Sequence, residues 1–268
     1  MPELPEIASR AREMRSAVLG RTISSVDVLQ EKSLNVPVEA FQEAIVGARL
    51  LAVRARGKWL QVQTTQGYLM INLGMGGEVL LTTPDTIPEK HRLLLHFRDG
   101  ELLVINFWWV GYAHWVTLDG LEGHRMTASL GPNALELDAE GLEELLLGRR
   151  GGIKSFLLKQ SNIAGIGNFY IHDILFRAGL HPLRTIPTIG KGAIVRLAAA
   201  ISEGLAPSLE LGGAWYEKRL DGTPGGFQRE ALLVAYREGE PCLTCGAPII
   251  KLKTGSTSGF ICPRCQPL

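Results

Sequence analysis

The spacing of apolar residues changes character about halfway along the chain. In residues 22–118, short apolar runs are separated by turn residues such as Asp99-Gly100, a pattern typical of β-strands. The clearest runs cover residues 26–28, 60–63 and 93–97. Before them, the apolar positions of residues 7–19 have helical spacing and Gly20 follows, so we expect a helix there.

From residue 138 onward the spacing becomes helical. Asp138 is the expected N-cap of a helix that runs through Leu147, and Gly148 is its expected stop. Residues 153–159, 168–178 and 191–205 have helical spacing as well. Strands followed by helices predict an α+β chain in two domains, with the linker near residues 131–137.

The composition agrees with a folded protein and disfavours a membrane protein. With 268 residues, 46% of them hydrophobic, the chain can build one large core or two modest ones. Charged residues among the first thirty leave no apolar segment for a signal peptide. The most apolar stretch, residues 102–116, contains Asn106 and His114 and is shorter than the ~20 residues that span a bilayer. We therefore expect a soluble, intracellular protein.

The net charge of +1 neither indicates nor excludes a nucleic-acid partner, so any basic surface must be local. Arg54, Arg56 and Lys58 alternate with small residues, and on a strand these three side chains would share one face. From this segment alone, a DNA-binding surface and an ordinary solvated strand face are equally open.

All the cysteines lie near the C-terminus with the spacing C-x2-C-x16-C-x2-C: Cys242, Cys245, Cys262 and Cys265. Two such pairs can offer four thiolates to one tetrahedral zinc ion. The alternative is two disulfides, which an intracellular chain disfavours. Four thiolates would fill the coordination sphere, so we expect one structural Zn²⁺ and no catalytic metal.

The N-terminus carries the candidate chemistry. A small residue such as proline after Met1 favours removal of the initiator methionine, which would give Pro2 a free secondary amine. An α-amino group has a pKa of ~8, so a useful fraction is neutral near pH 7. A neutral amine can attack an electrophilic sugar carbon and form an iminium. Glu3 is adjacent and could protonate the ring oxygen or shuttle protons.

Six motifs in a fixed order resemble the formamidopyrimidine-DNA glycosylase and endonuclease VIII family, and the likeness runs nearly end to end. They are the start at residues 1–6, Lys58 within 56–60, the methionine loop 72–77, the segment 130–132, the glycine turn 164–170, and residues 221–225 followed by the four cysteines. The resemblance implies an N-terminal β-sandwich domain with an N-terminal helix (1–130), a helical helix–two-turns–helix domain (131–236) and a zinc-ribbon finger (237–268).

The resemblance also implies roles for individual residues. Pro2 would be the nucleophile, Glu3 the general acid and Glu6 a support for the same site, while Lys58 would contact a phosphate beside the lesion. Without the other motifs, the plain geometry of an interhelical turn would explain the glycines of residues 164–170. The expected DNA-binding residues are Met75, His91, Trp108, Trp109, Lys154, Gly165, Gly167, Asn168, Lys251 and Lys253.

The chain departs from the family where the family inserts side chains into the space of an extruded base. Met75 matches the family's methionine, but Trp108 stands in place of an arginine and Val110 in place of a phenylalanine. Thr257 occupies the position of a phosphate-binding arginine on the zinc hairpin. Asn72 and Asp173 stand where a histidine and a glutamate are usual. Of the adjacent tryptophans Trp108 and Trp109, we expect one to point inward and one outward.

The leading prediction is a bifunctional DNA glycosylase and lyase of base-excision repair, cytoplasmic, nucleoid-associated and monomeric, acting on damaged DNA. The altered residues favour a substrate other than 8-oxoguanine in duplex: abasic, ring-opened, single-stranded, distorted, bulky or crosslinked DNA. The alternative is a protein that binds damaged or branched DNA with little catalysis. A metabolic hydrolase is a distant third, because no Ser–His–Asp spacing or phosphate loop stands out.

Overall fold

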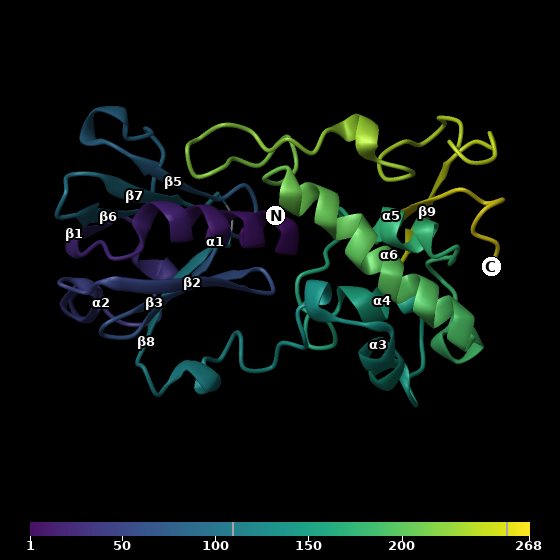
Figure 1. Cartoon of the computed structure of the whole chain (residues 1–268), viewed down its shortest axis with the longest axis horizontal. Helices are drawn as coiled ribbons and strands as arrows, with labels where there is room; N and C mark the ends of the chain where they lie inside the picture. The colour runs from purple at the N-terminus through teal and green to yellow at the C-terminus, as the bar shows by residue number, and fades with distance from the viewer. Residues whose placement is uncertain (109, 256) are drawn as a thin grey trace. The chain divides into compact units, whose positions relative to one another are not determined.

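The computed structural model describes residues 1–108, 110–255 and 257–268 (Figure 1). The chain forms two compact units. Unit 1 comprises Met1–Ser129 and Ser208–Phe227, and unit 2 comprises Leu130–Pro207 and Gln228–Leu268. This division differs from the three consecutive segments expected from the sequence, because a later segment returns to the first unit and the cysteine segment shares a unit with the helices.

Unit 1 contains two four-stranded antiparallel sheets. One has the order β1 (Ile23–Val28), β6 (Leu93–Phe97), β7 (Leu102–Asn106), β5 (Glu78–Thr82), and the other β2 (Leu50–Arg56), β3 (Trp59–Thr64), β4 (Tyr68–Asn72), β8 (Tyr112–Val116). Both sheets contribute to one core, which includes Leu103 and Ile105 of β7 and Val62 of β3. Leu102 and Val104 point to the opposite side of β7 and pack in a second, smaller cluster. An unbroken apolar strand is therefore buried on both faces.

Helix α1 (Leu4–Val18) closes the core of unit 1 at the N-terminus of the chain. Ile7, Ala11, Met14 and Val18 lie on one stripe of the helix and all face the core, as the helical spacing of residues 7–19 predicts. Helix α2 (Val38–Ile45) adds Phe41 and Ile45 to the same core. Short 3-10 turns lie at Glu31–Ser33, Pro84–Thr86, Leu121–Gly123, Ala134–Glu136, Ile186–Thr188 and Arg229–Ala231.

Unit 2 is helical, with one strand pair. Its elements are α3 (Ala139–Leu146), α4 (Ile153–Leu158), α5 (Ile171–Arg177), α6 (Lys191–Glu210, of which the last residues belong to unit 1), and the antiparallel strands β9 (Ile250–Thr254) and β10 (Thr257–Ile261). The carboxylate of Asp138 accepts a hydrogen bond from the Gly141 N–H at 2.8 Å, which confirms the predicted N-cap of α3. Together the two units confirm the predicted α+β class.

Helix α6 is longer than the sequence pattern predicts and continues through Pro207 to Glu210. By length and composition it is one helix that could cross a membrane, with 39% of its most apolar window buried. Its packing is that of a core helix, because a β-carbon on Gly204 would lie 2.7 Å from Cγ1 of Ile174 in α5. The two helices therefore approach closely at Gly204, which explains the small residue there.

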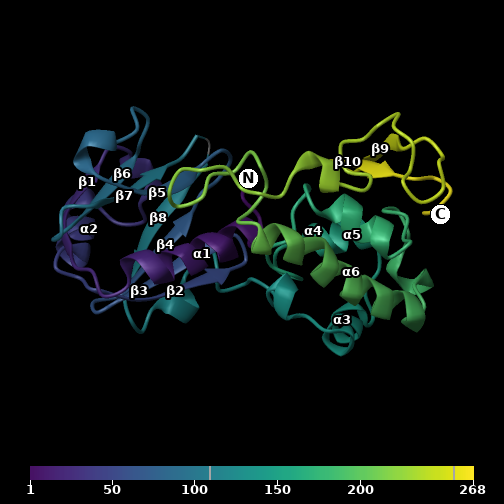
Figure 2. The same ribbon diagram turned by 45° about the horizontal axis from the view of Figure 1, so that its top comes forward.

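The cysteine segment packs onto the helices of unit 2. The side chain of Gln266 is fully buried and donates to the Leu180 carbonyl at 2.8 Å. Val234, Ile249 and Phe260 form an apolar cluster around the cysteines. Figure 1 shows β9 beside α5, and Figure 2 shows β9 and β10 together near the same helix, which β10 contacts. The strand pair is thus part of the same core as the helices.

A buried histidine pair in unit 1 couples stability to pH. His114 Nδ1 lies 2.9 Å from His124 Nε2, and His124 Nδ1 lies 2.8 Å from Thr127 Oγ1. The ring of Trp59 packs against both imidazoles. Burial, together with the neighbouring His124, lowers the pKa of His114 to about 4, and burial also lowers the pKa of His124.

We predict that unit 1 loses stability as the pH falls from about 6.5 toward 4. A histidine with a lowered native pKa stays neutral while the unfolded chain takes up the proton, so stability present above the unfolded pKa is lost below it. Thermal unfolding of wild type and His114→Gln between pH 7.5 and 4.5 measures this, because glutamine can hydrogen-bond but does not titrate. The wild type should lose more stability than the variant; equal losses would show that the pair does not contribute.

Candidate active site

The first turn of α1 holds the N-terminal residues in place. Glu3 is the N-cap, and its backbone N–H donates to Glu6 Oε2 at 2.9 Å in a capping box, with the reciprocal bond from the backbone of Glu6 to the Glu3 side chain. Pro2 is buried, and the Glu3 and Glu6 side chains are 3% and 4% exposed. Local capping chemistry therefore places three of the four predicted catalytic residues together.

Glu6 is also tied to the segment that returns to unit 1. Its Oε1 accepts from Ser208 Oγ at 3.2 Å and from the Ala214 N–H at 3.1 Å. Gly213 has a φ of +104°, and a β-carbon there would lie 3.0 Å from Glu6 Cγ. Both carboxylate oxygens of Glu6 accept hydrogen bonds, so its geometry suits the predicted supporting role rather than proton transfer.

Glu217 is a site residue that the sequence reasoning missed. The residue is 7% exposed, and its Oε1 lies 3.8 Å from the amine of Met1. Burial raises the pKa of Glu217 to about 7, with repulsion from Glu6 and Glu3 adding to the effect while the amine and Arg10 oppose it. No motif marks this position; only its proximity to residues 221–225 could have drawn attention to it.

A cavity of about 550 Å³ opens beside the N-terminus, lined entirely by unit 1. Its walls include Met1, Lys90, Trp108, Tyr216, Glu217 and Lys218. Lys218 pairs with Glu78 at 2.8 Å on the same wall. The cavity thus combines an amine, the buried carboxylate of Glu217 and aromatic rings, a lining suited to holding a sugar and a base.

Lys58 lies in the hairpin turn between β2 and β3, not on the strand. The predicted shared strand face of Arg54, Arg56 and Lys58 is therefore wrong for Lys58, because β2 ends at Arg56 and Gly57 turns the chain with a φ of +57°. Lys58 is half-buried, and its carbonyl accepts from Asn72 Nδ2 at 3.0 Å. Asn72 thereby ties this turn to the methionine loop.

The loops expected to enter DNA are exposed on unit 1. Met75, Trp108 and Val110 have 51%, 65% and 69% of their surface exposed, a large apolar area for one set of loops. The ammonium of Lys90 lies 5.9 Å from the centroid of the Trp108 ring, within cation–π range.

The two tryptophans are only partly described. Trp108 is exposed, as expected for the outward-pointing member of the pair. Trp109 lies outside the described residues, so the inward-pointing member stays a prediction. His91 is half-buried, with Nδ1 2.8 Å from the Pro88 carbonyl.

In unit 2 the glycine turn precedes α5. Gly165 has a φ of +106°, and its N–H donates to Gln160 Oε1 at 2.9 Å, so that donor is already used within the protein. Gly167 is buried. Asn168 is half-buried, and its Oδ1 is buried without a hydrogen-bond partner among the described residues. An amide oxygen and a phosphate oxygen both accept hydrogen bonds, so only the Nδ2 group of Asn168 could bind a phosphate, and this contact stays a prediction.

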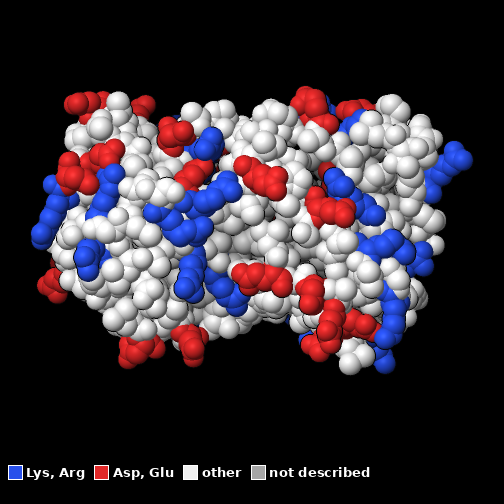
Figure 3. Space-filling view, viewed as in Figure 1, with Lys and Arg blue, Asp and Glu red and all other residues white. Residues whose placement is uncertain are grey.

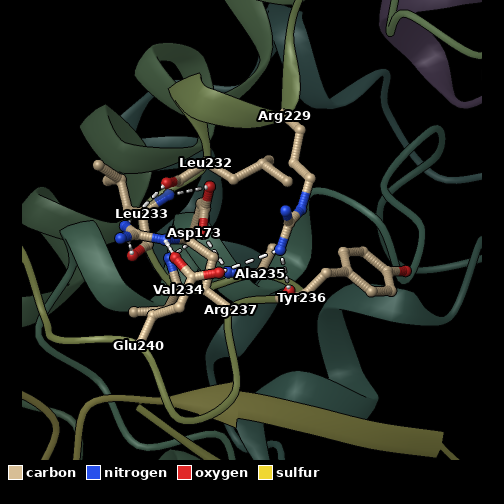
Figure 4. A network of polar contacts seen from close by, with 9 residues as sticks. All are labelled: Asp173, Arg229, Leu232, Leu233, Val234, Ala235, Tyr236, Arg237 and Glu240. Atoms are coloured by element: carbon tan, nitrogen blue, oxygen red, sulfur yellow. Dashed lines mark hydrogen bonds and ion pairs between the residues drawn. The ribbon is translucent and has the colours of Figure 1, made fainter. Parts of the chain in front are cut away.

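Asp173 anchors the loop that leads to the cysteines (Figure 4). Its carboxylate accepts from the backbone N–H groups of Leu233, Val234 and Ala235 at 2.9, 2.9 and 3.0 Å. Burial raises the pKa of Asp173, and these hydrogen bonds oppose the rise. The next residue, Tyr236, has a φ of +58°, and its ring stacks on Phe169 at 5.7 Å. Aspartate is thus long enough for this anchoring role.

Lys154 occupies an interior position. It is 2% exposed, and Nζ donates to Thr254 Oγ1 at 2.9 Å, Thr257 Oγ1 at 3.1 Å and the Ser258 carbonyl at 2.5 Å. Burial lowers its pKa to about 8. A phosphate contact by Lys154 stays a prediction, and this geometry argues against it, because an ammonium has three N–H donors and all three are used.

The exposed basic residues of the strand pair are Lys251 and Lys253, which alternate along β9 and share one side of it. Thr257, at the position of the family's arginine, is partly buried by its contact with Lys154. Figure 3 shows acidic and basic residues interspersed on the face viewed, without one large basic patch. On this face, phosphate contacts would therefore come from separate cations.

The four cysteine sulfurs gather as the spacing predicts. They lie within 4.8 Å of one another, with Cys242 Sγ 3.9 Å from Cys265 Sγ and Cys245 Sγ 3.4 Å from Cys262 Sγ. These separations exclude disulfides, whose sulfurs are ~2 Å apart. Tetrahedral Zn²⁺ with ~2.3 Å bonds needs sulfurs about 3.8 Å apart. The site fits a single structural Zn²⁺, with no coordination position left for chemistry.

Known protein families and proteins resemble this chain along nearly its whole length. Residues 1–106 match the formamidopyrimidine-DNA glycosylase N-terminal domain, and residues 130–219 match its H2TH domain. Residues 239–268 match the zinc finger found in FPG and IleRS. A formamidopyrimidine-DNA glycosylase from Methylococcus capsulatus is 35% identical, over 99% of this chain and 100% of that protein. The chain belongs to the formamidopyrimidine-DNA glycosylase family.

Family membership confirms the resemblance read from the sequence, together with the predicted helix–two-turns–helix and zinc-finger parts. It also confirms the broader prediction of a DNA glycosylase and lyase of base-excision repair. Among solved structures, the Lactococcus lactis Fpg bound to DNA with an abasic site has a TM-score of 0.90 and 28% identity, covering 99% of this chain and all of that one. A Lactococcus lactis Fpg mutant with Fapy-dG DNA has a TM-score of 0.91 at the same identity, covering both chains fully.

We predict that Cys262→Ser abolishes zinc binding and weakens DNA binding. Loss of the ion frees the strand pair that carries Lys251 and Lys253, so the slope of log affinity against log salt should fall by about 1 to 2. Metal analysis should give one zinc per wild-type chain and none in the variant.

The control is Lys251→Gln with Lys253→Gln, which should keep the zinc and lower the slope by the same amount. A Cys262→Ser protein that retains zinc, or a metal-free protein with unchanged DNA affinity, would contradict the assignment.

Proposed function

We propose that this chain is a DNA glycosylase and abasic-site lyase whose Pro2 amine, freed by removal of Met1, forms a Schiff base with the sugar of a damaged nucleotide. The proposal rests on the N-terminal turn, which buries Pro2, Glu3 and Glu6, and on the buried Glu217, which lies 3.8 Å from the Met1 amine on the wall of a cavity. A secondary amine in such a setting can displace a base and form an iminium. Elimination from that iminium then breaks the strand.

The remaining residues of the chain support this chemistry with separate roles. Glu3 donates a proton to the ring oxygen, and Glu6 holds the N-terminal turn through its bonds to Ser208 and Ala214. Lys58 contacts a phosphate next to the lesion. Asn168, Lys251 and Lys253 bind phosphates farther along the strand.

The lesion preference follows from Trp108. An arginine at this position could pair with the base left without a partner, whereas an indole can stack but cannot make those hydrogen bonds. Met75 and Val110 add apolar surface only. We propose that the enzyme prefers lesions that leave the stack easily: abasic sites, ring-opened bases, single-stranded, distorted, bulky or crosslinked DNA.

A binding protein with little catalysis is the second candidate. The absent arginine at Thr257 and the altered Trp108 favour it, because both changes weaken contacts used to extrude a base. The three buried carboxylates near the N-terminus favour catalysis, since a DNA-binding surface does not need buried acids. We further propose that the protein acts as a cytoplasmic, nucleoid-associated monomer.

The amine is tested by borohydride trapping. With abasic DNA, borohydride should reduce the iminium and join the protein to the strand. Retention of Met1 turns the Pro2 nitrogen into an amide and should reduce trapping by ~100-fold or more, the scale of a lost catalytic group. Pro2→Gly should also trap poorly. Intact mass must show whether Met1 has been removed. Efficient trapping by a form that retains Met1 would contradict the proposed mechanism.

The lesion preference is tested by single-turnover cleavage at fixed salt across a panel of substrates. Excision of 8-oxoguanine from fully paired duplex should be slow, and abasic sites, single strands and destabilised pairs should react faster. Trp108→Ala should slow the favoured substrates by about 5- to 100-fold, the range of one lost base–aromatic stack.

Val110→Ala is the matched control for these measurements, because it shortens an exposed apolar side chain in the same loop. Fast excision of duplex 8-oxoguanine with a strong preference for opposite cytosine would overturn the proposed preference.

A further inference from the structure

Unit 1 buries a third carboxylate beside the N-terminal amine. Glu217 comes from the segment that returns to unit 1, far in sequence from Glu3 and Glu6, and its Oε1 lies 3.8 Å from the Met1 nitrogen. The residue lines the cavity and is 7% exposed. A charged carboxylate is costly to bury without a partner, so this position calls for an explanation.

Among the described residues, the Met1 amine is the cation that lies within ion-pair distance of Glu217. The guanidinium of Arg10 pairs with Glu13, and Lys218 pairs with Glu78 at 2.8 Å. The other charged groups around Glu217 are the buried Glu3 and Glu6 and, on the cavity wall, Glu89 and Lys90. Glu217 is thus set among other acids and next to one amine.

The three carboxylates differ in what they can do. Glu6 accepts hydrogen bonds on both oxygens, and Glu3 caps α1. Burial, reinforced by Glu6 and Glu3, raises the pKa of Glu217 to about 7. A group that exchanges protons most effectively has a pKa near the working pH, and Glu217 meets that condition.

We propose that Glu217 accepts the proton that the N-terminal amine loses when its nitrogen bonds to the sugar. The inference rests on the proposed role of Pro2 as nucleophile. Peptide geometry sets the nitrogen of Pro2 about 3 Å from that of Met1, so it lies within about 7 Å of Glu217 Oε1. Removal of Met1 opens the intervening part of the cavity, which one water or a side-chain rotation can span.

The chemistry of a secondary amine determines how protons and electron pairs move in this step. The nitrogen lone pair forms a bond to the sugar C1, and the bond from C1 to the base breaks with its electron pair leaving on the base, which takes a proton from water. The nitrogen, now positively charged, gives its proton to Glu217, which becomes a carboxylic acid. The nitrogen lone pair then opens the bond from C1 to the ring oxygen, which takes a proton from Glu3, and the iminium results. On an abasic site no base leaves: the nitrogen bonds to C1 of the open-chain aldehyde, and the carbonyl oxygen departs as water after taking one proton from Glu3 and one from the solvent.

The test is the pH dependence of single-turnover borohydride trapping on abasic DNA by the full chain without Met1. In the wild type, both the amine and Glu217 must be deprotonated, so log rate against pH should rise with a slope approaching 2 on the acid side. Glu217→Gln should react on the order of 100-fold more slowly at pH 7 and show a slope of 1. Glu217→Asp keeps a titrating group and should retain the steeper slope at a reduced rate.

Glu89→Gln removes one carboxylate from the exposed rim of the same cavity and is the matched control, with an unchanged slope expected. Affinity for a tetrahydrofuran abasic analogue, which cannot react, reports whether each variant is folded and binds. A Glu217→Gln protein with full affinity, a slope of 2 and a rate within about threefold of wild type would overturn the proposal. Failure of the proposed function looks different, since the wild type itself would then not trap at any pH.

Discussion

The acids on one side of α1 are the constraint on which the active site depends. Glu6 and Glu13 lie two turns apart, and both accept hydrogen bonds from the returning segment: Glu6 from Ser208 and Ala214, Glu13 from Arg219 and the Leu220 N–H. These bonds join the beginning of the chain to residues more than 200 positions later. Since Glu217 lies between the two anchored points, its approach to the N-terminal amine follows from the same bonds.

The sequence correctly predicted those features of the fold that depend on residues close together in the chain or on a fixed spacing. Asp138 caps α3, the apolar stripe of α1 faces the core, and the cysteine spacing brings four sulfurs together. Each of these features depends on residues a few positions apart or on a spacing set by one metal ion. Lys58 was misplaced because Gly57 turns the hairpin one residue before it, which alternation alone does not reveal.

The features that sequence reasoning missed depend on contacts between distant segments. Lys154 reads as a surface cation, yet it is buried by hydrogen bonds to the strand pair about a hundred residues later. Glu217 reads as one of many acids, and only the fold places it beside the amine. Burying Lys154 is favourable only because three acceptors meet its ammonium, so removing one of them should matter more for the strand pair than the loss of a surface contact would.

An acidic interior in a protein that meets a polyanion has an electrostatic consequence. The phosphates of DNA add negative potential at the cavity, which favours the protonated forms of both a carboxylic acid and an amine. Cations at the rim oppose this effect, and Lys90 and Lys218 line the same cavity as Glu217. Lys218 is paired with Glu78 and Lys90 lies over Trp108, so neither is an isolated charge. The protonation of the N-terminal amine and of Glu217 therefore depends on these local pairs and not on the net charge of +1.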